Sequence, residues 1–530
     1  MAGWSPKIPW VVALAASALA LLFHVVFMLH AGALWRDEVN TAQFATFPSL
    51  AELWSSLKYD SFPLVSTLML RLWTWLPWGE GDFGLRIFGL LVGAAGLAAL
   101  WFSARVLGHS VPLISMALLG FTPLVIRFGD SIRPYGIGMV FMLLAFGLIG
   151  QATVRPGPRQ VLAAAVAAVL SVQCLYQNAL LLLAVCVGGV AAGLHFGEWK
   201  RAVVPAGIGA LAALSLLPYG ESIRQAQDWA VVNQASTDFR SIWGVLRQAL
   251  GSAGAVMAWI WILLFAGALI AALPLFRSPI RGSETVEGLT LYAAASMAVG
   301  TAAFLVFVRL SGLPSQPWYY VPLMALTAVC METIVAGRKT GAAWRVALAV
   351  AVIVISFSSV WPEIRGRQTN VDLIADKLER SSAREDMILV NPWYYGVTFQ
   401  RYYKGHTPWV TLPPLEDLRV HRYDLLKRQM TSPDAIEPVL ERIDQTLRSG
   451  HRVWVVGSLP APLEEQSPPR LPPAPGGPWG WNSHPYRSAW ASQVSYLIHS
   501  RAARSDVLAV GSDIRVSPHE RADLLVVSLR

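Results

Sequence analysis

Two adjacent carboxylates lie in the stretch "LWRDEVNTAQF", residues 34–44, which follows the first long apolar run of the chain. Asp37 and Glu38 are of the type that serves as a general base or as oxygen ligands for a hard divalent cation. Charged groups are costly near lipid, so an acid pair at the end of an apolar run favours a functional role. Helix capping or plain loop polarity is the simpler interpretation of Asp37.

A second acid lies in "FGDSIRPYG", residues 128–136, a short turn between two apolar runs. We take Asp130 as the third catalytic candidate, with Arg133 and Tyr135 as candidates for binding a lipid phosphate. Arginine suits that role because its guanidinium group binds phosphate oxygens in pairs. Asp130 is alternatively a simple turn residue.

Further candidates for binding a substrate or a lipid phosphate lie in other loops or at their edges. They are Lys58, Asp60, Arg309, Gln316 and Tyr319. Asp60 equally fits a turn, because Asp-Ser stands before Phe-Pro. An acid that deprotonates an acceptor hydroxyl, with Arg and Lys to neutralise a departing phosphate, is the minimum machinery for transferring a sugar from a lipid phosphate.

The sequence offers few candidate metal ligands and few cysteines. Asp37, Glu38 and Asp130 are also the candidate ligands of a divalent cation, Mg²⁺ or Mn²⁺, and no other cofactor is expected. The chain has 3 cysteines, all within apolar runs. Disulfide frameworks and cysteine-type zinc sites are therefore not expected.

The composition indicates a membrane protein. The chain has 530 residues, of which 54% are hydrophobic and 14% are charged. A soluble globular protein carries about 25% charged residues, so much of this chain must lie in lipid. The net charge of +9 could suggest a nucleic-acid partner. We expect none, because many Lys and Arg residues fall in short loops between apolar runs, which is the pattern that orients membrane proteins.

Apolar runs long enough to span a bilayer recur along the first two thirds of the chain. With about 20 residues needed per span, we predict about eleven. They are 9–30, 84–107, 111–128, 134–151, 160–176, 178–196, 202–219, 254–276, 288–310, 317–336 and 343–361. The first run exceeds the apolar core of a typical signal peptide, so we interpret it as a span. Cleavage after it stays open as the alternative, because Ala31-Gly32-Ala33 has the small residues of a cleavage site.

The positive-inside rule orients these spans. With Lys7 in the cytoplasm, every second loop that carries basic residues is also cytoplasmic. These basic residues are Arg105, Arg155, Arg159, Lys200, Arg201, Arg277, Arg281, Arg338, Lys339 and Arg345. The loops 31–83 and 220–253, and all residues after 361, then face outward. We predict a multi-pass protein of the plasma (inner) membrane with an extracytoplasmic active site.

The domain organisation follows from this topology. Residues 1–361 form a predicted transmembrane module. Its outer loop 31–83 carries two predicted interfacial helices rich in Leu and Trp, around residues 49–57 and 64–76. Residues 362–530 form a predicted extracytoplasmic α/β domain. Its predicted strands are 386–392, 452–459 and 522–530, and its predicted helices are 371–381 and 435–450. The Pro/Gly-rich segment 467–481 is a loop or a strip that binds a partner.

Several short motifs carry a family resemblance. They are "WRDE" (35–38), "YDSFPLVSTLMLRLW" (59–73), "LRIFGLLVG" (85–93), "DSIRPYGIG" (130–138) and "PWYYVPLMAL" (317–326). With this set the chain resembles membrane glycosyltransferases of the GT-C superfamily, close to the protein O-mannosyltransferases and the lipid A aminoarabinose transferases. It departs from the family at Phe62, where a His is common, and at Gln316, near a frequent Arg.

The resemblance implies a polytopic helical GT-C fold, an outward-facing active site beneath the first loop and a polyprenyl-phosphate-linked sugar donor. It implies that Asp37 is the catalytic residue of the first loop, that Asp130 is the second acidic position and that Arg133 lies near the donor phosphate. Our main hypothesis is therefore a hexosyl- or pentosyltransferase. It would move a sugar to a hydroxyl group of a lipid, polysaccharide or protein acceptor, with inversion at the anomeric carbon.

Two other functions stay open. One is a ligase or polymerase that transfers oligosaccharides from a lipid pyrophosphate, which shares the outward face and the acidic loops. The other is a transporter or lipid flippase without a transfer reaction. Transporters place ionisable residues near the bilayer midplane, whereas the predicted spans here have few charges at their centres.

Overall fold

The computed structural model of the chain describes residues 7–109, 111–230, 237–277, 285–312, 314–337, 342–461, 468–474, 482–511 and 513–529. Arg281, Arg338 and Lys339, which contributed to the predicted orientation, and half of the segment 467–481 lie outside these residues. The chain divides into two compact units. The helical unit comprises Met1–Leu29, Phe62–Glu221 and Ser236–Arg365, and the α/β unit comprises His30–Ser61, Ser222–Ala235 and Gly366–Arg530. We describe each unit by itself.

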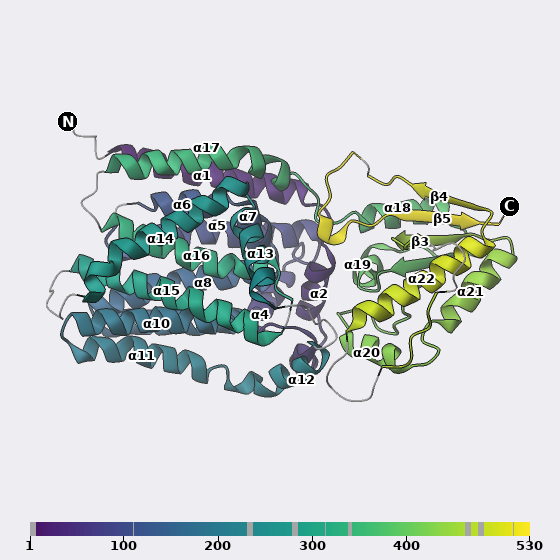
Figure 1. The fold of residues 1–530 in the computed structure, drawn as a ribbon, viewed down its shortest axis with the longest axis horizontal. Helices are drawn as coiled ribbons and strands as arrows, with labels where there is room; N and C mark the ends of the chain where they lie inside the picture. The colour runs from purple at the N-terminus through teal and green to yellow at the C-terminus, as the bar shows by residue number, and fades with distance from the viewer. Residues whose placement is uncertain are drawn as a thin grey trace. The chain divides into compact units, whose positions relative to one another are not determined.

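The helical unit consists of a bundle of mostly long helices (Figure 1). They are α1 (Lys7–His30), α4 (Leu64–Thr74), α5 (Asp82–Val106), α6 (Leu113–Gly120), α7 (Pro123–Gly129), α8 (Pro134–Val154), α9 (Pro158–Cys174), α10 (Asn178–His195), α11 (Trp199–Leu214), η2 (Leu217–Tyr219), α13 (Phe239–Leu250), α14 (Ala255–Arg277), α15 (Thr285–Ser311), η4 (Pro317–Tyr320), α16 (Val321–Ala336) and α17 (Ala342–Ile364).

Within the described residues, 9 helices are long and apolar enough to cross a membrane. The other two predicted spans are helical but shorter. Residues 160–176 fall in α9, which has 17 residues. Residues 111–128 are divided between α6 and α7, because Pro123 lacks a backbone N–H and begins a new helix. The predicted polytopic helical fold is confirmed.

The helices of this unit differ in how far they are enclosed. α10 packs along α15 and α11, and α8 packs along α9 and α5. α16 and the preceding η4 are mostly buried, whereas most residues of α14 are exposed or half-buried. α16 therefore belongs to the interior of the bundle, while α14 leaves most of its apolar surface for lipid.

The α/β unit combines residues 30–61 and 222–235 with the C-terminal part of the chain, and most of α12 (Gly220–Ala230) belongs to it. Its helices are α2 (Arg36–Ala45), α3 (Leu50–Ser56), η1 (Leu57–Tyr59), α18 (Val371–Ser381), α19 (Tyr395–Tyr402), α20 (Tyr423–Thr431), α21 (Glu437–Arg448), α22 (Ser483–Arg501) and η5 (Pro518–Glu520). Its strands are β1 (Met387–Asn391), β2 (Trp409–Thr411), β3 (Val453–Gly457), β4 (Arg504–Leu508) and β5 (Leu524–Ser528).

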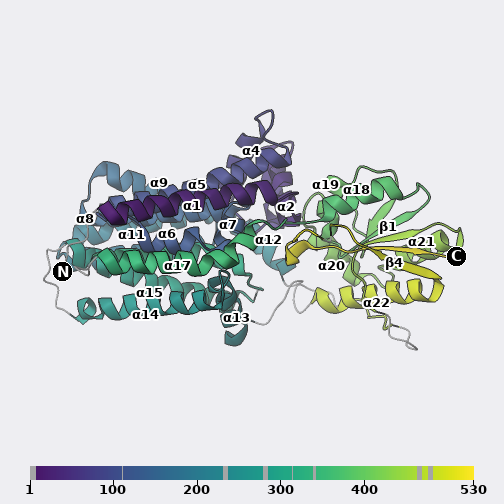
Figure 2. The ribbon, with the colours of Figure 1, turned by 90° about the horizontal axis from the view of Figure 1, so that it is seen from above.

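The strands form one mixed sheet in the order β2-β1-β3-β5-β4. β1 is parallel to β2 and β3, whereas β5 is antiparallel to β3 and β4. Helices cover both faces, with α18 and α19 on one side and α21 and α22 on the other (Figure 2). The predicted α/β fold of this region is therefore confirmed, and it is a three-layer arrangement.

Side chains of the central strands β1 and β3 point alternately to the two faces of the sheet, and each face has its own apolar cluster. Leu389 and Val455 face the apolar cluster that contains Ile443 of α21. Val390 and Val456, the next residues along these strands, face the cluster that contains Phe399 of α19. Because both faces are covered, these strands are apolar throughout, which is why they could be recognised in the sequence.

The packing of the first loop differs from the predicted division at residue 361. Residues 30–61 group with the C-terminal part of the chain, because α2 packs against α19. The loop helix predicted around residues 49–57 is present as α3 and η1, and the Ser49 side chain accepts a hydrogen bond from the Glu52 N–H. Whether residues 362–530 fold as a domain by themselves stays a prediction.

Candidate active site

The predicted site residues fall in both units. Asp37, Glu38, Lys58 and Asp60 belong to the α/β unit, and Asp130, Arg133, Tyr135, Arg309, Gln316 and Tyr319 belong to the helical unit. The structure therefore places each group within its own unit, and their convergence in one pocket stays a prediction.

Asp130 is held by a histidine of the first helix. It lies in the turn between α7 and α8, and its Oδ1 and Oδ2 atoms are 2.7 and 2.8 Å from Nδ1 of His24. Only 3% of Asp130 and 3% of His24 is exposed. Burial raises the pKa of the Asp130 carboxyl to about 6, although His24 and Arg86 act in the opposite direction. A carboxyl with a pKa near neutrality is suited to exchanging a proton under physiological conditions.

Two glycines of α5 allow this turn to approach closely. A Cβ atom at Gly89 would lie 1.8 Å from the main-chain oxygen of Asp130. A Cβ atom at Gly93 would lie 2.0 Å from Oδ1 of Asp130 and 2.6 Å from Nδ1 of His24. The motif "LRIFGLLVG" thus supplies the space in which the buried pair forms.

An aromatic cluster lies next to Arg133, three residues after Asp130. Its guanidinium carbon lies 4.4 Å from the ring centroid of Phe62. The Phe62 ring packs edge-on against Tyr135 at 5.5 Å, and Tyr135 lies 5.9 Å from the ring of Tyr319. The main-chain oxygen of Tyr319 accepts a hydrogen bond of 2.9 Å from the Gln177 side chain. Three predicted binding residues, Arg133, Tyr135 and Tyr319, therefore belong to one cluster.

Arg309 and Gln316 occupy more open positions. Arg309 is exposed in the last turn of α15, and its main-chain oxygen accepts a hydrogen bond from Thr237 at 3.3 Å. Gln316 is half-buried before η4, where its main-chain oxygen accepts from the Tyr319 N–H at 3.0 Å. The exposed guanidinium group of Arg309 is accessible to an anionic ligand.

In the α/β unit, Asp37 and Glu38 form the first turn of α2, and we call them the acid pair. Asp37 retains 18% of its side-chain exposure and lies 3.5 Å from Nε of Arg36. Glu38 is fully buried. Of the two, Asp37 is therefore the carboxylate that solvent or a substrate can reach.

Lys58 and Asp60 follow on the same loop. The Lys58 ammonium nitrogen lies 5.2 Å from the ring centroid of Tyr59. Asp60 is buried, and its Oδ1 accepts a hydrogen bond of 3.0 Å from the Ser61 N–H. This local bond agrees with the turn interpretation of Asp60.

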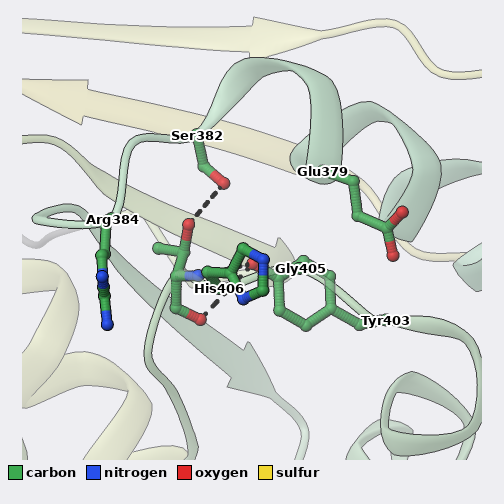
Figure 3. A pocket seen from close by; sticks show the side chains of 7 residues that line it. Glu379, Ser382, Arg384, Tyr403, Gly405 and His406 are labelled. Atoms are coloured by element: carbon green, nitrogen blue, oxygen red, sulfur yellow. Dashed lines mark hydrogen bonds between the residues drawn. The ribbon is translucent and has the colours of Figure 1, made fainter.

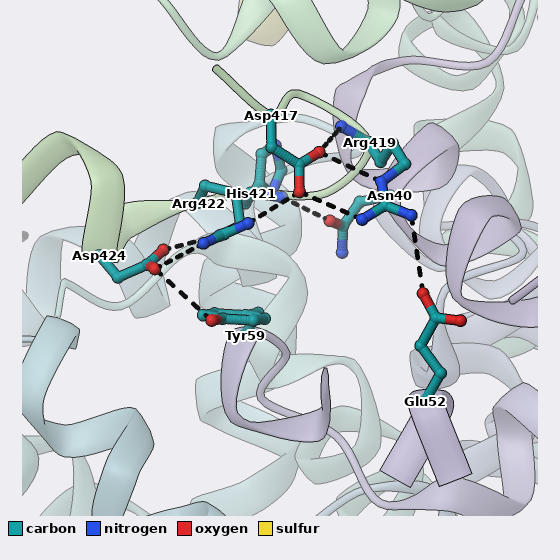
Figure 4. Close-up of polar contacts among 8 residues, drawn as sticks. All are labelled: Asn40, Glu52, Tyr59, Asp417, Arg419, His421, Arg422 and Asp424. Atoms are coloured by element: carbon teal, nitrogen blue, oxygen red, sulfur yellow. Dashed lines mark hydrogen bonds and ion pairs between the residues drawn. The ribbon is translucent and has the colours of Figure 1, made fainter. Parts of the chain in front are cut away.

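A charged network joins the first loop to residues 417–424 (Figure 4). Arg422 binds Asp424 through two hydrogen bonds of 2.8 Å and Asp417 through one of 2.7 Å. Its guanidinium carbon also lies 4.7 Å from the ring centroid of Tyr59. Burial raises the pKa of Asp424, but the hydrogen bonds and charge of Arg422 outweigh it and the pKa is lowered. Asp424 therefore stays ionised and holds Arg422 over Tyr59.

A separate pocket of about 340 Å³ lies before β1 and β2 (Figure 3). Its lining residues are Glu379, Ser382, Arg384, Tyr403, Gly405, His406 and Thr407. The Ser382 and Thr407 hydroxyls are 2.7 Å apart, and the Thr407 N–H donates to the Tyr403 hydroxyl at 3.1 Å. These bonds within the wall stabilise the two loops, and the pocket contains none of the predicted site residues.

The predicted site for a divalent cation is not present in the part of the chain that the structure describes. There, no group of three or more His, Cys, Asp or Glu side chains is arranged to hold a metal ion. We therefore derive no reaction step through a cation.

Three residues close to the predicted site were missed in the sequence. His24 pairs with Asp130, Arg86 lowers the pKa of Asp130, and Glu520 binds the residue before the acid pair. A signal existed for His24, because an ionisable residue inside a span is by default a functional candidate. Glu520 had no such signal, because it stands 484 positions from its partner Arg36.

Comparisons with known proteins give a limited result. No protein-family model and no curated protein matches the chain. Similar solved structures include ArnT from Cupriavidus metallidurans bound to undecaprenyl phosphate, with 14% identity, 85% of this chain and 93% of that chain covered, and a TM-score of 0.47. The apo state of that ArnT has the same identity and coverage, with a TM-score of 0.35.

A third similar structure is the oligosaccharyltransferase from Archaeoglobus fulgidus tethered with an acceptor peptide. It has 9% identity, with 84% of this chain and 69% of that chain covered, and a TM-score of 0.47. ArnT is a lipid A aminoarabinose transferase, one of the protein types that the sequence motifs resemble. With TM-scores of 0.47 and below, the likenesses carry no further argument.

Proposed function

We propose that this protein transfers a sugar from a polyprenyl phosphate to a hydroxyl group of an acceptor, at the outer face of the membrane. The observation that carries the proposal is the turn after α7, where Asp130 is buried against His24 and Arg133 stacks on Phe62. An oriented guanidinium group is what phosphate binding requires. Asp130, with its near-neutral pKa, is the second acidic residue of the proposed site and is suited to exchanging a proton.

Asp37 is the general base of the proposed reaction. Its carboxylate accepts the proton of the acceptor hydroxyl while that oxygen attacks the anomeric carbon of the sugar. The bond between the anomeric carbon and the phosphate oxygen breaks, and the polyprenyl phosphate leaves with the electron pair. A single displacement of this kind inverts the configuration at the anomeric carbon.

Arg133 binds the phosphate in this proposal, with Lys58 or Arg309 as the second cation. The contact with Phe62 restricts the rotation of the Arg133 guanidinium group, so its planar fork is oriented before a phosphate arrives. The half-buried ring of Tyr319 supplies apolar surface for the first prenyl units and a phenol group for the sugar, and the buried ring of Tyr135 packs beside it.

The acid pair provides the test. The purified protein in lipid nanodiscs is incubated with a radiolabelled polyprenyl-phosphate sugar and candidate acceptors of the lipid, polysaccharide and peptide classes. We expect transfer by the wild type and a fall of at least a hundredfold in Asp37→Asn, because general-base catalysis contributes about 10²–10⁴-fold. Asp376→Asn, which changes an exposed carboxylate of α18, is the matched control and should retain full activity.

The products separate the alternatives. A polyprenyl monophosphate product and an inverted linkage by nuclear magnetic resonance support the proposal. Transfer only from a polyprenyl-pyrophosphate oligosaccharide offered in a parallel assay, with release of polyprenyl pyrophosphate, would assign the chain to the ligases. Movement of the intact donor across the bilayer of sealed liposomes without transfer would assign it to the flippases. Full activity of Asp37→Asn would remove Asp37 from the mechanism.

A further inference from the structure

The helix that carries the acid pair begins without a cap of its own. α2 starts at Arg36, and the preceding residue is Trp35, whose side chain makes no capping hydrogen bond. The first N–H groups of a helix have no partner inside the helix, and a side-chain oxygen of Ser, Thr, Asp or Asn usually accepts from them. An indole group cannot do so, because its nitrogen is only a donor.

Glu520, from the C-terminal end of the chain, supplies the missing acceptor. Its Oε2 atom accepts a hydrogen bond of 2.9 Å from the Arg36 N–H, and its Oε1 atom accepts one of 2.7 Å from the Thr398 hydroxyl. The Glu520 side chain is fully buried. Thr398 therefore orients the carboxyl group toward the start of α2.

The residue before Glu520 holds the side chain of Arg36. The main-chain oxygen of His519 accepts a hydrogen bond of 2.6 Å from the Arg36 guanidinium group. The same guanidinium group lies 4.6 Å from the ring centroid of Tyr394. Both the backbone and the side chain of the residue next to Asp37 are thus fixed by the C-terminal part of the α/β unit.

Further hydrogen bonds bracket the acid pair on both sides. Before it, the Gln368 N–H donates to the main-chain oxygen of Ala31 at 2.8 Å, and the Leu34 N–H donates to the Tyr402 hydroxyl at 2.7 Å. After it, the His421 N–H donates to the Asn40 side chain at 2.9 Å (Figure 4). The segment around Asp37 therefore depends on partners that are hundreds of residues away.

We propose that Glu520 is a positioning residue for the transfer reaction: by capping α2 from the C-terminal part of the chain, it sets the orientation of the acid pair. This inference rests on the proposed role of Asp37 as the base. It gives the C-terminal α/β region a function in the reaction, which is to hold the helix that carries the base.

The experiment compares variants of the full-length protein in nanodiscs. Glu520→Ala removes both acceptor oxygens, whereas Glu520→Gln keeps an oxygen for the Arg36 N–H and an amide group for the Thr398 hydroxyl. Thr398→Val leaves the carboxyl group in place without its orienting hydroxyl. Glu437→Ala is the matched control. Glu437 also lies in the first turn of a helix, α21, but its side chain is exposed and pairs with Arg470.

Two readouts are taken for each variant. Hydrogen exchange of the peptide that covers α2 measures the cap directly, and kcat and KM for the polyprenyl-phosphate donor measure the reaction. In Glu520→Ala we expect exchange in α2 to accelerate, because loss of a cap destabilises the helix. We expect kcat to fall about tenfold, because a misplaced base loses the geometry that proton transfer requires. KM for the donor should change less than twofold. Thr398→Val should show a weaker effect in the same direction, and Glu520→Gln and Glu437→Ala should resemble the wild type.

The possible outcomes separate this inference from the proposed function. Unchanged exchange in α2 of Glu520→Ala, or accelerated exchange with an unchanged kcat, overturns the inference while the transferase proposal stands. A loss of exchange protection throughout the protein, in Glu520→Gln as well as in Glu520→Ala, also overturns it, because Glu520 would then support the whole fold. A wild-type protein without transfer activity overturns the proposed function itself.

Discussion

Two helices of this protein, one in each unit, receive their N-terminal acceptor from a distant glutamate. In the helical unit, α6 begins after Pro112, which has no capping side chain, and Oε2 of Glu332 accepts from the N–H groups of Ile114 and Ser115 at 2.6 and 3.0 Å. In the α/β unit, α2 begins after Trp35 and receives Glu520. Glu332 accepts from the second and third N–H groups of its helix, whereas Glu520 accepts from the first.

Their surroundings differ in charge. Glu332 forms a buried ion pair with Arg345 in addition to its two backbone donors. Glu520 has one backbone donor and one hydroxyl donor, while the Arg36 guanidinium group donates to a main-chain oxygen. Burial raises the pKa of Glu520 to about 8, although Arg36 and Thr398 lower it. The carboxyl group of Glu332 is thus paired with the full positive charge of Arg345, whereas burial raises the pKa of the Glu520 carboxyl group.

Breaking the Glu332–Arg345 pair is the change with the largest expected effect. Arg345→Leu leaves the Glu332 carboxylate buried without its guanidinium partner, and removal of one partner of a buried pair costs about 3–5 kcal/mol. The thermal unfolding midpoint in detergent should fall strongly. Arg380→Leu, which removes an exposed partner of Asp376, is the control and should change stability by less than about 1 kcal/mol. Equal midpoints in the two variants would show that Arg345 adds nothing to the cap.

The Glu520 cap should make stability depend on pH. An acid whose pKa is about 8 in the folded protein and 4.5 when unfolded keeps its proton in the folded state across that interval. Stability therefore falls as the pH rises from 4.5 to 8, and the penalty is fully present above 8. The groups that face Glu520 are Arg36 and Asp37 of α2, Tyr395 of α19 and its own neighbour His519.

Glu520→Gln tests this dependence. Relative to the wild type, the variant should gain stability between pH 5 and pH 8.5 by a few kcal/mol, because each pKa unit is equivalent to about 1.4 kcal/mol. The unfolding midpoint is measured across that range, with Glu437→Gln as the control that leaves the pH dependence unchanged. A constant difference between Glu520→Gln and wild type at every pH would mean that Glu520 is ionised throughout.

The parts of the structure that the sequence predicted are those set by local pattern. Apolar runs of the length of residues 134–151 must be helical in lipid, because every backbone group needs a partner within the segment. The strands 386–392 and 452–459 are recognisable because both faces of the sheet are buried and the runs are apolar throughout. Strand β4 escaped prediction because three of its 5 residues are exposed and its side chains show no apolar run.

The candidate site was predicted only in part for the same reason. Asp130, Arg133 and Tyr135 stand in one short turn, so a local motif was sufficient to find them. The partners that decide their chemistry lie elsewhere, as His24 is 106 positions from Asp130. The association of residues 30–61 with the C-terminal part of the chain depends on pairs such as Arg36 with Glu520, which no spacing rule connects.

A third prediction concerns the space that Gly93 leaves for the buried Asp130. In the helical unit, the space at Gly93 allows Asp130 and His24 to meet. Gly93→Ala would place a methyl group 2.0 Å from Oδ1 of Asp130, and overpacking of this kind costs about 1–3 kcal/mol. Gly207→Ala in α11 is the control, because a Cβ atom there meets nothing within 4 Å and alanine favours the helix. If both variants unfold at the same temperature, the close approach of the turn to α5 does not limit stability.

In the α/β unit, the first loop is held by long charged side chains rather than by a close approach of two backbones. Substitution of Arg422, which belongs to this network, has the smallest of the expected effects. Arg422→Lys keeps the charge but loses the paired bonds to Asp424 and the contact with Tyr59. We expect a loss of about 1–2 kcal/mol, because hydrogen bonds to charged groups are worth about that much. Protease cleavage within residues 50–61 should accelerate, since this segment loses a partner.

Arg419→Lys is the control and should be nearly neutral, because the Arg419 side chain is 55% exposed. If Arg419→Lys were the more harmful change, the first loop would be held by its exposed charges, and the contrast between the two units would disappear.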